Sequence, residues 1–175
     1  MRLGARAVGG GLVPLLLWLL LWLSGCSASR IENGVFFSNK GYHVALPLVG
    51  WQVVKNHEAD LVLEAPRRHA VMAAHASCGG VLPTRDLPIL ARHLRFGVER
   101  LALIEQKTAA VAGHSGLRSR FLGSLEGSSV EIEHYVLKAG GCVHDLIYAA
   151  PPEEFSKGQD EFSKFVGSFA LYGAQ

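Results

Sequence analysis

Short glycine-containing turns divide the second half of this 175-residue chain into a series of apolar segments. The turns lie at 112–114, 126–128 and 139–141, and the segments are 102–112, 116–125, 130–137 and 142–150. Turns this short leave no room for a crossover connection, because parallel neighbours need a dozen or more residues between them. The second half therefore predicts antiparallel strands joined by hairpins.

Four more strands are predicted before the glycine pair at 79–80. Residues 42–46 alternate between apolar and polar side chains and stop at Pro47, which is the period of a half-buried strand. The other three segments are 51–54, 60–65 and 70–78. Segment 70–78 is almost wholly small and apolar, so we expect it to be buried on both faces and central in its sheet. Residues 35–37 could add an early strand.

Two helices are predicted, one between the strand groups and one near the end of the chain. Asp86 can cap a helix over 86–97, in which leucines recur at steps of three and four residues. Phe162, Phe165, Val166 and Phe169 place four large side chains on one side of a helix over 159–170. The predicted fold class is α+β: an α/β/α sandwich with a mostly antiparallel sheet of about six to eight strands and helices packed on it.

The first 25 residues are predicted to be a cleaved signal peptide. Arg2 and Arg6 precede the uncharged run 12–23, which is the layout of a secretory signal. That run is too short to cross a bilayer, since a spanning helix needs about 20 apolar residues. An apolar helix of the folded domain is the alternative. We expect residues 26–40 to form a tether and 41–175 to form one domain.

The signal ends in Leu23-Ser24-Gly25-Cys26, which resembles the lipobox of bacterial lipoproteins. The resemblance implies cleavage between Gly25 and Cys26 and acylation of Cys26, which would join the protein to membrane lipid. Ser27 follows the cysteine, where aspartate favours retention in the inner membrane in such lipoproteins. The implied location is the outer membrane, facing the periplasm. A chance cysteine behind an ordinary signal is the alternative.

The charge balance argues against a nucleic-acid partner, and the cysteine count predicts a disulfide. Without Arg2 and Arg6, the 17 Lys and Arg residues fall to 15, which equals the 15 Asp and Glu residues. A nucleic-acid partner is not expected, because such proteins carry a basic excess. With Cys26 acylated, Cys78 and Cys142 remain as a pair, and an oxidising compartment favours a disulfide between them. Two separate buried thiols are the alternative.

The sequence contains no recognisable catalytic motif. Gly113-His114-Ser115-Gly116 lacks the frame of a nucleophile elbow and is better explained as a hairpin turn. His57-Glu58 has Leu61 where a zinc protease has its second histidine. The remaining candidate is a soft-metal site: Cys142 and His144 share one face of a strand, and Cys78 could lie nearby. A disulfide would remove that site, and we expect no cofactor.

A family resemblance covers nearly the whole predicted domain. Residues 41–47, Gly50-Trp51, 60–63 and 166–169 look like the PsbP-like family of extrinsic photosystem proteins and their Mog-type relatives. Residues 135–138, 141–146 and 151–152, within 94–169, also look like uncharacterised lipoproteins of deltaproteobacteria. The resemblance implies an α/β/α sandwich that acts through docking surfaces, and it carries over no functional residue.

These observations predict a non-enzymatic lipoprotein that binds an unknown envelope protein or small ligand. No catalytic residue and no metal ligand is expected in that reading. The competing prediction is a metal-binding or enzymatic periplasmic protein that uses Cys78, Cys142 and His144.

Overall fold

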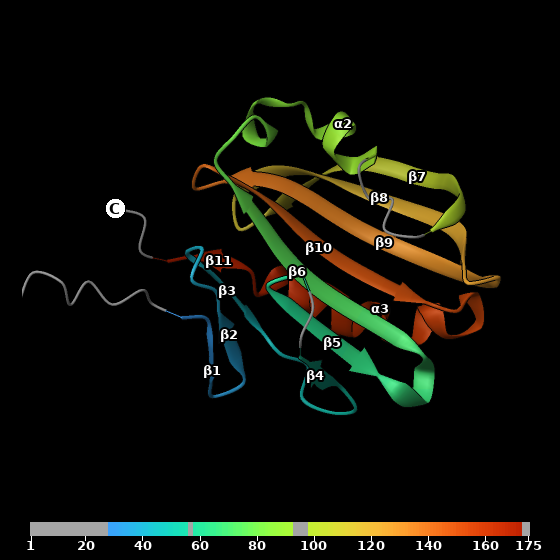
Figure 1. Ribbon diagram of the computed structural model, residues 1–175. Helices are drawn as coiled ribbons and strands as arrows, with labels where there is room; N and C mark the ends of the chain where they lie inside the picture. The colour runs from blue at the N-terminus through green and yellow to red at the C-terminus, as the bar shows by residue number, and fades with distance from the viewer. Residues whose placement is uncertain (1–27, 56–57, 93–97, 173–175) are drawn as a thin grey trace, which may run out of the picture.

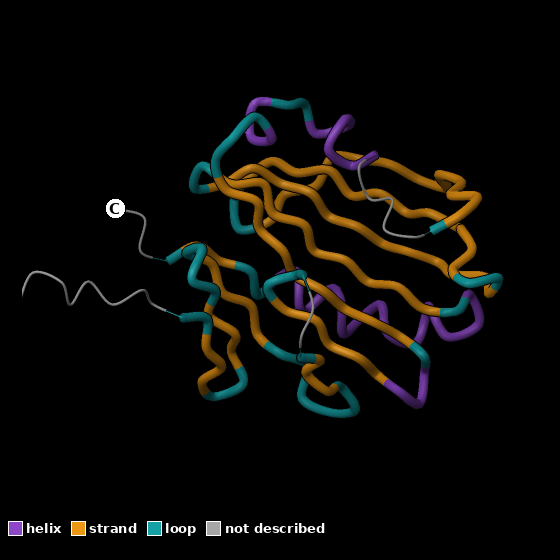
Figure 2. The backbone as a smooth tube through the Cα atoms, viewed as in Figure 1, coloured by secondary structure: helices purple, strands orange, loops and turns teal. Residues whose placement is uncertain are grey.

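The computed structural model describes residues 28–55, 58–92 and 98–172, which form two antiparallel sheets (Figures 1 and 2). The larger sheet has seven strands in the order β4-β5-β6-β10-β9-β8-β7. Its strands are β4 (Gln52–Val54), β5 (Leu61–Ala65), β6 (Ala70–Cys78), β7 (Glu99–Val111), β8 (His114–Leu125), β9 (Ser128–Ala139) and β10 (Cys142–Ala150). The α+β sandwich with a mainly antiparallel sheet is confirmed, and so is the predicted range of strand number.

The predicted hairpins are present between β7, β8, β9 and β10. Gly140 and Gly141 connect β9 to β10 with φ values of 57° and 74°, a left-handed conformation that side chains with a Cβ rarely adopt. Ala112 and Gly113 make the same kind of turn between β7 and β8. His114 and Ser115 are therefore the first residues of β8, as expected for a hairpin.

A second sheet of four strands lies beside the first, in the order β1-β2-β3-β11. Its strands are β1 (Arg30–Glu32), β2 (Val35–Phe37), β3 (Tyr42–Ala45) and β11 (Ala170–Leu171). This sheet was not predicted, although the early strand at 35–37 is confirmed. Strands β1 and β2 lie within residues 26–40, the predicted tether, and Phe36 of β2 is only 4% exposed and belongs to the core.

Helix α3 (Pro152–Gly167) covers one face of the larger sheet, behind it in Figure 1. Its buried Phe155, Phe162 and Phe165 pack against the side of the sheet that carries Met72 and Tyr148. The helix begins seven residues before the predicted start at 159, because Pro152 has a fixed φ that suits the first turn. It ends at Gly167, and Ala170 of the predicted helix belongs to β11 instead.

Among the described residues, few cover the opposite face of the larger sheet. Helix α2 (Leu87–Arg92) packs there with Leu90 and Ala91 against strands β8, β9 and β10. It occupies the first part of the predicted helix 86–97, and residues 93–97 lie outside the described residues. Two short 3₁₀ turns, η1 (Pro66–Arg68) and η2 (Leu82–Thr84), complete the fold.

Strand β6 is interior, as predicted, but it is not buried on both faces. Alternate residues of β6 are buried under α3, while Val71 on the other side is 37% exposed. The small side chains of β6 lie where the sheet packs closely against the aromatic core. The apolar run in the sequence therefore indicates one tightly packed face and not burial on both faces. β10 is the middle strand of the seven.

The predicted signal peptide, Gly25 and Cys26 lie outside the described residues. Within the part that is described, the structure contains no helix with the length and apolarity needed to span a membrane.

Candidate functional site

The two cysteines of the predicted pair are bonded to each other. Cys78 at the end of β6 lies directly opposite Cys142 at the start of β10, with 4.1 Å between their Cα atoms. The predicted disulfide is therefore confirmed, and the alternative of two separate thiols is wrong. The predicted soft-metal site is also wrong, because the disulfide takes both sulfur atoms that would have bound the metal.

His144 shares a strand face with Cys142, as predicted, but its surroundings are those of a core residue. The side chain is buried, and its Nε2 atom donates a 3.0 Å hydrogen bond to the carbonyl oxygen of Ala139. Its ring meets the rings of Tyr42 and Phe169 edge-on. Burial lowers the pKa of His144, so the ring stays neutral at the pH where a free histidine begins to charge. Among the described residues, no group of three or more His, Cys, Asp and Glu side chains could hold a metal ion.

The candidate functional site is the face of the larger sheet that points away from α3, called here the open face. Residues alternate between the two faces of each strand, so Val143 and Asp145 of β10 belong to the open face while His144 and Leu146 face α3. One row of directly opposed residues crosses five strands of the open face and is apolar throughout. It contains Leu103, Phe121, Ile132, Ala149 and Val71.

A buried histidine and a carboxylate form the main polar contact of the open face. Nε2 of His134 on β9 lies 2.7 Å from Oδ1 of Asp145 on β10. Asp145 remains partly exposed, whereas His134 is fully buried and its Nδ1 has no hydrogen-bond partner in the described part of the chain. As predicted, Asp145 points away from its neighbour His144. The contact with His134 was not predicted, because it joins residues of two different strands.

The predicted hairpin turn at 139–141 was the signal that could have found this pair. A tight turn there sets Ala139 opposite Cys142, and counting back places Val136 opposite Asp145. His134 is then the diagonal neighbour of Asp145 on the same face, within reach of a long side chain. The pair was not predicted, because Asp145 was compared only with its chain neighbour His144.

Ser119 lies directly opposite His134 on β8, so a serine, a histidine and an aspartate follow one another across the sheet. This order does not make a catalytic triad. Ser119 is fully buried, and its hydroxyl accepts a 2.9 Å hydrogen bond from Nε2 of Gln106. His134 directs Nε2 to Asp145, and no hydrogen bond joins it to Ser119 in the described structure. A nucleophile needs a bond to its base and access to substrate, and Ser119 has neither.

The described residues form at least two cavities on the open face. The first has a volume of about 380 Å³ and is lined by Glu58, Ala59, Ala73, His75, Asp145 and Ile147. Nε2 of His75 lies 3.2 Å from the hydroxyl oxygen of Ser77, and Nδ1 of His75 lies 3.8 Å from Asp60. The floor of this cavity is apolar, and its polar groups are a histidine and two carboxylates.

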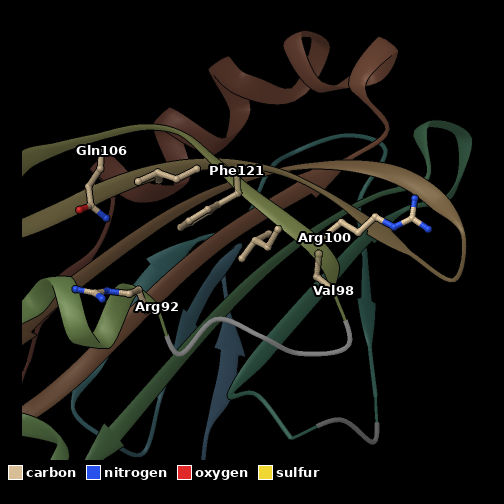
Figure 3. Close-up of a pocket in the computed structure, with 7 residues that line it drawn as sticks. Arg92, Val98, Arg100, Gln106 and Phe121 are labelled. Atoms are coloured by element: carbon tan, nitrogen blue, oxygen red, sulfur yellow. The ribbon is translucent and has the colours of Figure 1, made fainter.

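The second cavity has a volume of about 520 Å³ and lies between the end of α2 and strand β7 (Figure 3). Its lining residues are Arg92, Val98, Arg100, Leu101, Leu103, Gln106 and Phe121. Both volumes fall in the range of small-molecule sites, roughly 300–1,000 Å³. The open face is therefore an apolar surface with two hollows and a few polar groups.

No protein-family model matches the sequence, and a search of curated proteins found no match. Solved structures do resemble this fold. Cyanobacterial PsbP (CyanoP) from Synechocystis sp. PCC 6803 aligns over 86% of this chain and 99% of its own, with 13% identity and a TM-score of 0.54. LpqN, involved in cell envelope biogenesis of Mycobacterium tuberculosis, aligns over 75% of this chain and 83% of its own, with 15% identity and a TM-score of 0.60.

A third similar structure is the protein PA94 from Pseudomonas aeruginosa, described as a putative regulator of unknown function. It aligns over 86% of this chain and 100% of its own, with 8% identity and a TM-score of 0.51. Identities this low establish a shared fold and nothing about activity. The fold implied by the PsbP-like resemblance is therefore confirmed. None of the three descriptions names an enzymatic activity.

Proposed function

We propose that this protein is a lipid-anchored, non-enzymatic binding module of the bacterial envelope, and that the open face receives its ligand or partner. One observation carries the binding role. The face opposite α3 has two cavities with apolar floors, and five strands contribute to the apolar row between them. Sites for small molecules have this character, with mainly apolar walls and a few polar groups that fix orientation.

The polar groups of the open face favour binding over catalysis. Asp145 contacts His134. Ser119, which lies opposite His134, is buried and accepts a hydrogen bond from Gln106. The metal-dependent alternative has lost its two thiols to the disulfide. What remains at the surface is a set of groups that can orient a ligand.

The proposed anchor is Cys26, acylated after cleavage at the Gly25–Cys26 bond. Two or three acyl chains hold a protein on a bilayer durably, whereas one chain does so only marginally. Strand β1 begins at Arg30, four residues after Cys26. An extended chain spans at most about 3.5 Å per residue, so this link is no longer than about 14 Å. The domain would lie directly on the membrane, and Ser27 favours the outer one. LpqN offers a precedent for this fold in envelope biogenesis.

Mass spectrometry of the protein extracted from its native envelope tests the anchor. We expect a chain that starts at Cys26 and carries the added mass of diacylglycerol. The Cys26→Ser variant should retain residues 1–25 and lack that mass, while a Cys78→Ser, Cys142→Ser double variant should still be acylated. A natural product with an unmodified Cys26 would contradict the proposal.

Site-specific photo-crosslinking tests the binding face. A photoreactive residue at Val71, which is 37% exposed on the open face, should capture a ligand or partner in intact cells. The matched control places the same residue at Ser156, which is exposed on α3 on the opposite side. Adducts formed at Ser156 but not at Val71 would show that the protein binds through its other face.

A further inference from the structure

The cavity between α2 and β7 is bordered by two irregularities of strand β7. The pairing of β7 with β8 shifts by one residue between Glu99 and Ala102, and again between Leu103 and Glu105. Arg100 lies in the first bulge and has a φ of 52°. Bulges bend a strand and turn a side chain away from the regular pleat, and they are common beside binding sites. Here both bulges fall in the part of β7 that supplies Arg100, Leu101 and Leu103 to the cavity.

The charged side chains that line the cavity among the described residues are both positive. Arg92 and Arg100 line it from opposite sides (Figure 3), and no described lining residue is acidic. Neither arginine has a carboxylate within 4 Å among the described residues. On the other face of the same strands, Arg118 is held by Glu133 at 2.7 Å and Arg120 is held by Glu131. The described residues thus supply carboxylates to the arginines of one face and none to those of the cavity.

Apart from Gln106, the other described lining residues are apolar. Phe121 is 6% exposed and packs in a cluster with Val98 and Leu101, while Leu103 is 54% exposed at the rim. Gly123 allows this arrangement, because a Cβ at that position would lie 2.5 Å from Cγ1 of Val98. The segment that carries Arg100 therefore lies directly on the backbone of β8.

We propose that this cavity binds an anionic amphiphile, with a carboxylate or phosphate group at Arg92 or Arg100 and an aliphatic chain against Phe121, Leu101 and Leu103. Guanidinium groups form paired hydrogen bonds with such anions, and the aliphatic wall removes the chain from water. The proposal rests on the binding role of the open face and names the class of ligand that this part of it takes. Lipids and free fatty acids share the required chemistry.

Binding of dodecyl phosphate to the full chain in nanodiscs of zwitterionic phospholipid tests the proposal, with empty nanodiscs subtracted. We expect one site per chain. The Arg92→Gln, Arg100→Gln double variant should bind about tenfold more weakly, because charge-assisted hydrogen bonds are lost. The matched control, Arg67→Gln with Arg85→Gln, removes two other exposed arginines that lack a carboxylate partner among the described residues, and should bind as the natural protein does.

Two further probes test separately whether binding needs the anionic head group and the aliphatic chain. Dodecyltrimethylammonium should not compete, because its head group has the wrong charge, and inorganic phosphate should not compete, because it lacks the chain. Leu103→Ser should also weaken dodecyl phosphate binding, and an exposed position tolerates that change. Equal binding by both double variants, or equal competition by either probe, would overturn the proposal. Crosslinks at Val71 that persist in that case would leave the binding role of the open face intact.

Discussion

The hydroxyl of Tyr42 donates a 3.0 Å hydrogen bond to Oδ2 of Asp60, and this contact joins the two sheets. The same carboxylate accepts a 2.8 Å hydrogen bond from the backbone N–H of Ala76 and lies 2.6 Å from Nζ of Lys40. Burial, followed by the charge of Asp60, raises the pKa of Tyr42, so its hydroxyl stays protonated as a donor. Asp60 thus holds β3 and β6 at a fixed separation.

Replacement of Asp60 by Ala should lower the free energy of unfolding by about 2–4 kcal/mol, because the hydroxyl of Tyr42 loses its acceptor and the ammonium of Lys40, which also donates to the carbonyl oxygen of Ala76, loses its carboxylate. Urea denaturation followed by circular dichroism measures the change. Asp160→Ala is the matched control, since Asp160 is exposed on α3 and should change stability by no more than about 0.5 kcal/mol. Equal midpoints for the two variants would rule out this role for Asp60.

The disulfide between Cys78 and Cys142 should contribute about 4 kcal/mol, the value that the chain-entropy model gives for a separation of 64 residues. A double Cys→Ser variant should therefore unfold at a clearly lower temperature, and dithiothreitol should lower the melting temperature of the natural protein but not of the variant. Calorimetry gives both values. A melting temperature that does not respond to reduction would contradict the expected contribution.

Two glycines of α3 should respond in opposite ways to the same substitution. A Cβ at Gly158 would lie 2.4 Å from the hydroxyl oxygen of Tyr148, which is buried and donates to the carbonyl oxygen of Phe155. Gly158→Ala should therefore lower the free energy of unfolding by about 1–3 kcal/mol through overpacking. Gly167→Ala meets no atom within 4 Å and should leave stability unchanged or raise it slightly. Chemical denaturation of both variants makes the comparison, and equal losses would exclude steric contact as the cause.

Stability should fall as the pH is lowered below about 6.5, the ordinary pKa of histidine. Burial lowers the pKa of His144 in the folded protein, so the unfolded chain takes up the proton first and gains stability relative to the native state. The loss should continue until the pH passes the folded pKa. His144→Gln keeps a donor near Ala139 and removes the titration, so its stability should depend less on pH over this interval. Parallel curves for the two proteins would show that other groups cause the slope.

Most strands of the larger sheet were predictable because they are long enough to display a pattern and end at a turn residue; β4, with three residues, was located by the turn before Trp51. β6 and β10 match their predicted bounds residue for residue, with glycine pairs after Cys78 and before Cys142. β1, β2 and β11 contain only two or three residues each, which is too few for a periodic pattern. They are strands because residues distant in the sequence pair with them.

The candidate site was less predictable than the fold. The disulfide was predicted from the number of cysteines. The positions of Cys78 and Cys142 at the ends of two expected strands made the bond geometrically reasonable. The cavity beside β7 depends on two bulges, and a bulge is a one-residue change of register that leaves no clear mark in composition. The positions of Arg92 and Arg100 around Phe121 are set by that local geometry, so only the structure could assemble them.

Strand β3 has β2 on one side and β11 on the other, and β11 is synthesised after every other strand. A ribosome-bound chain that lacks β11 leaves β3 with one open edge, and a chain that ends before Phe169, which follows α3, also leaves Tyr42 without that aromatic ring. Folding of the domain therefore finishes only when translation has passed residue 171.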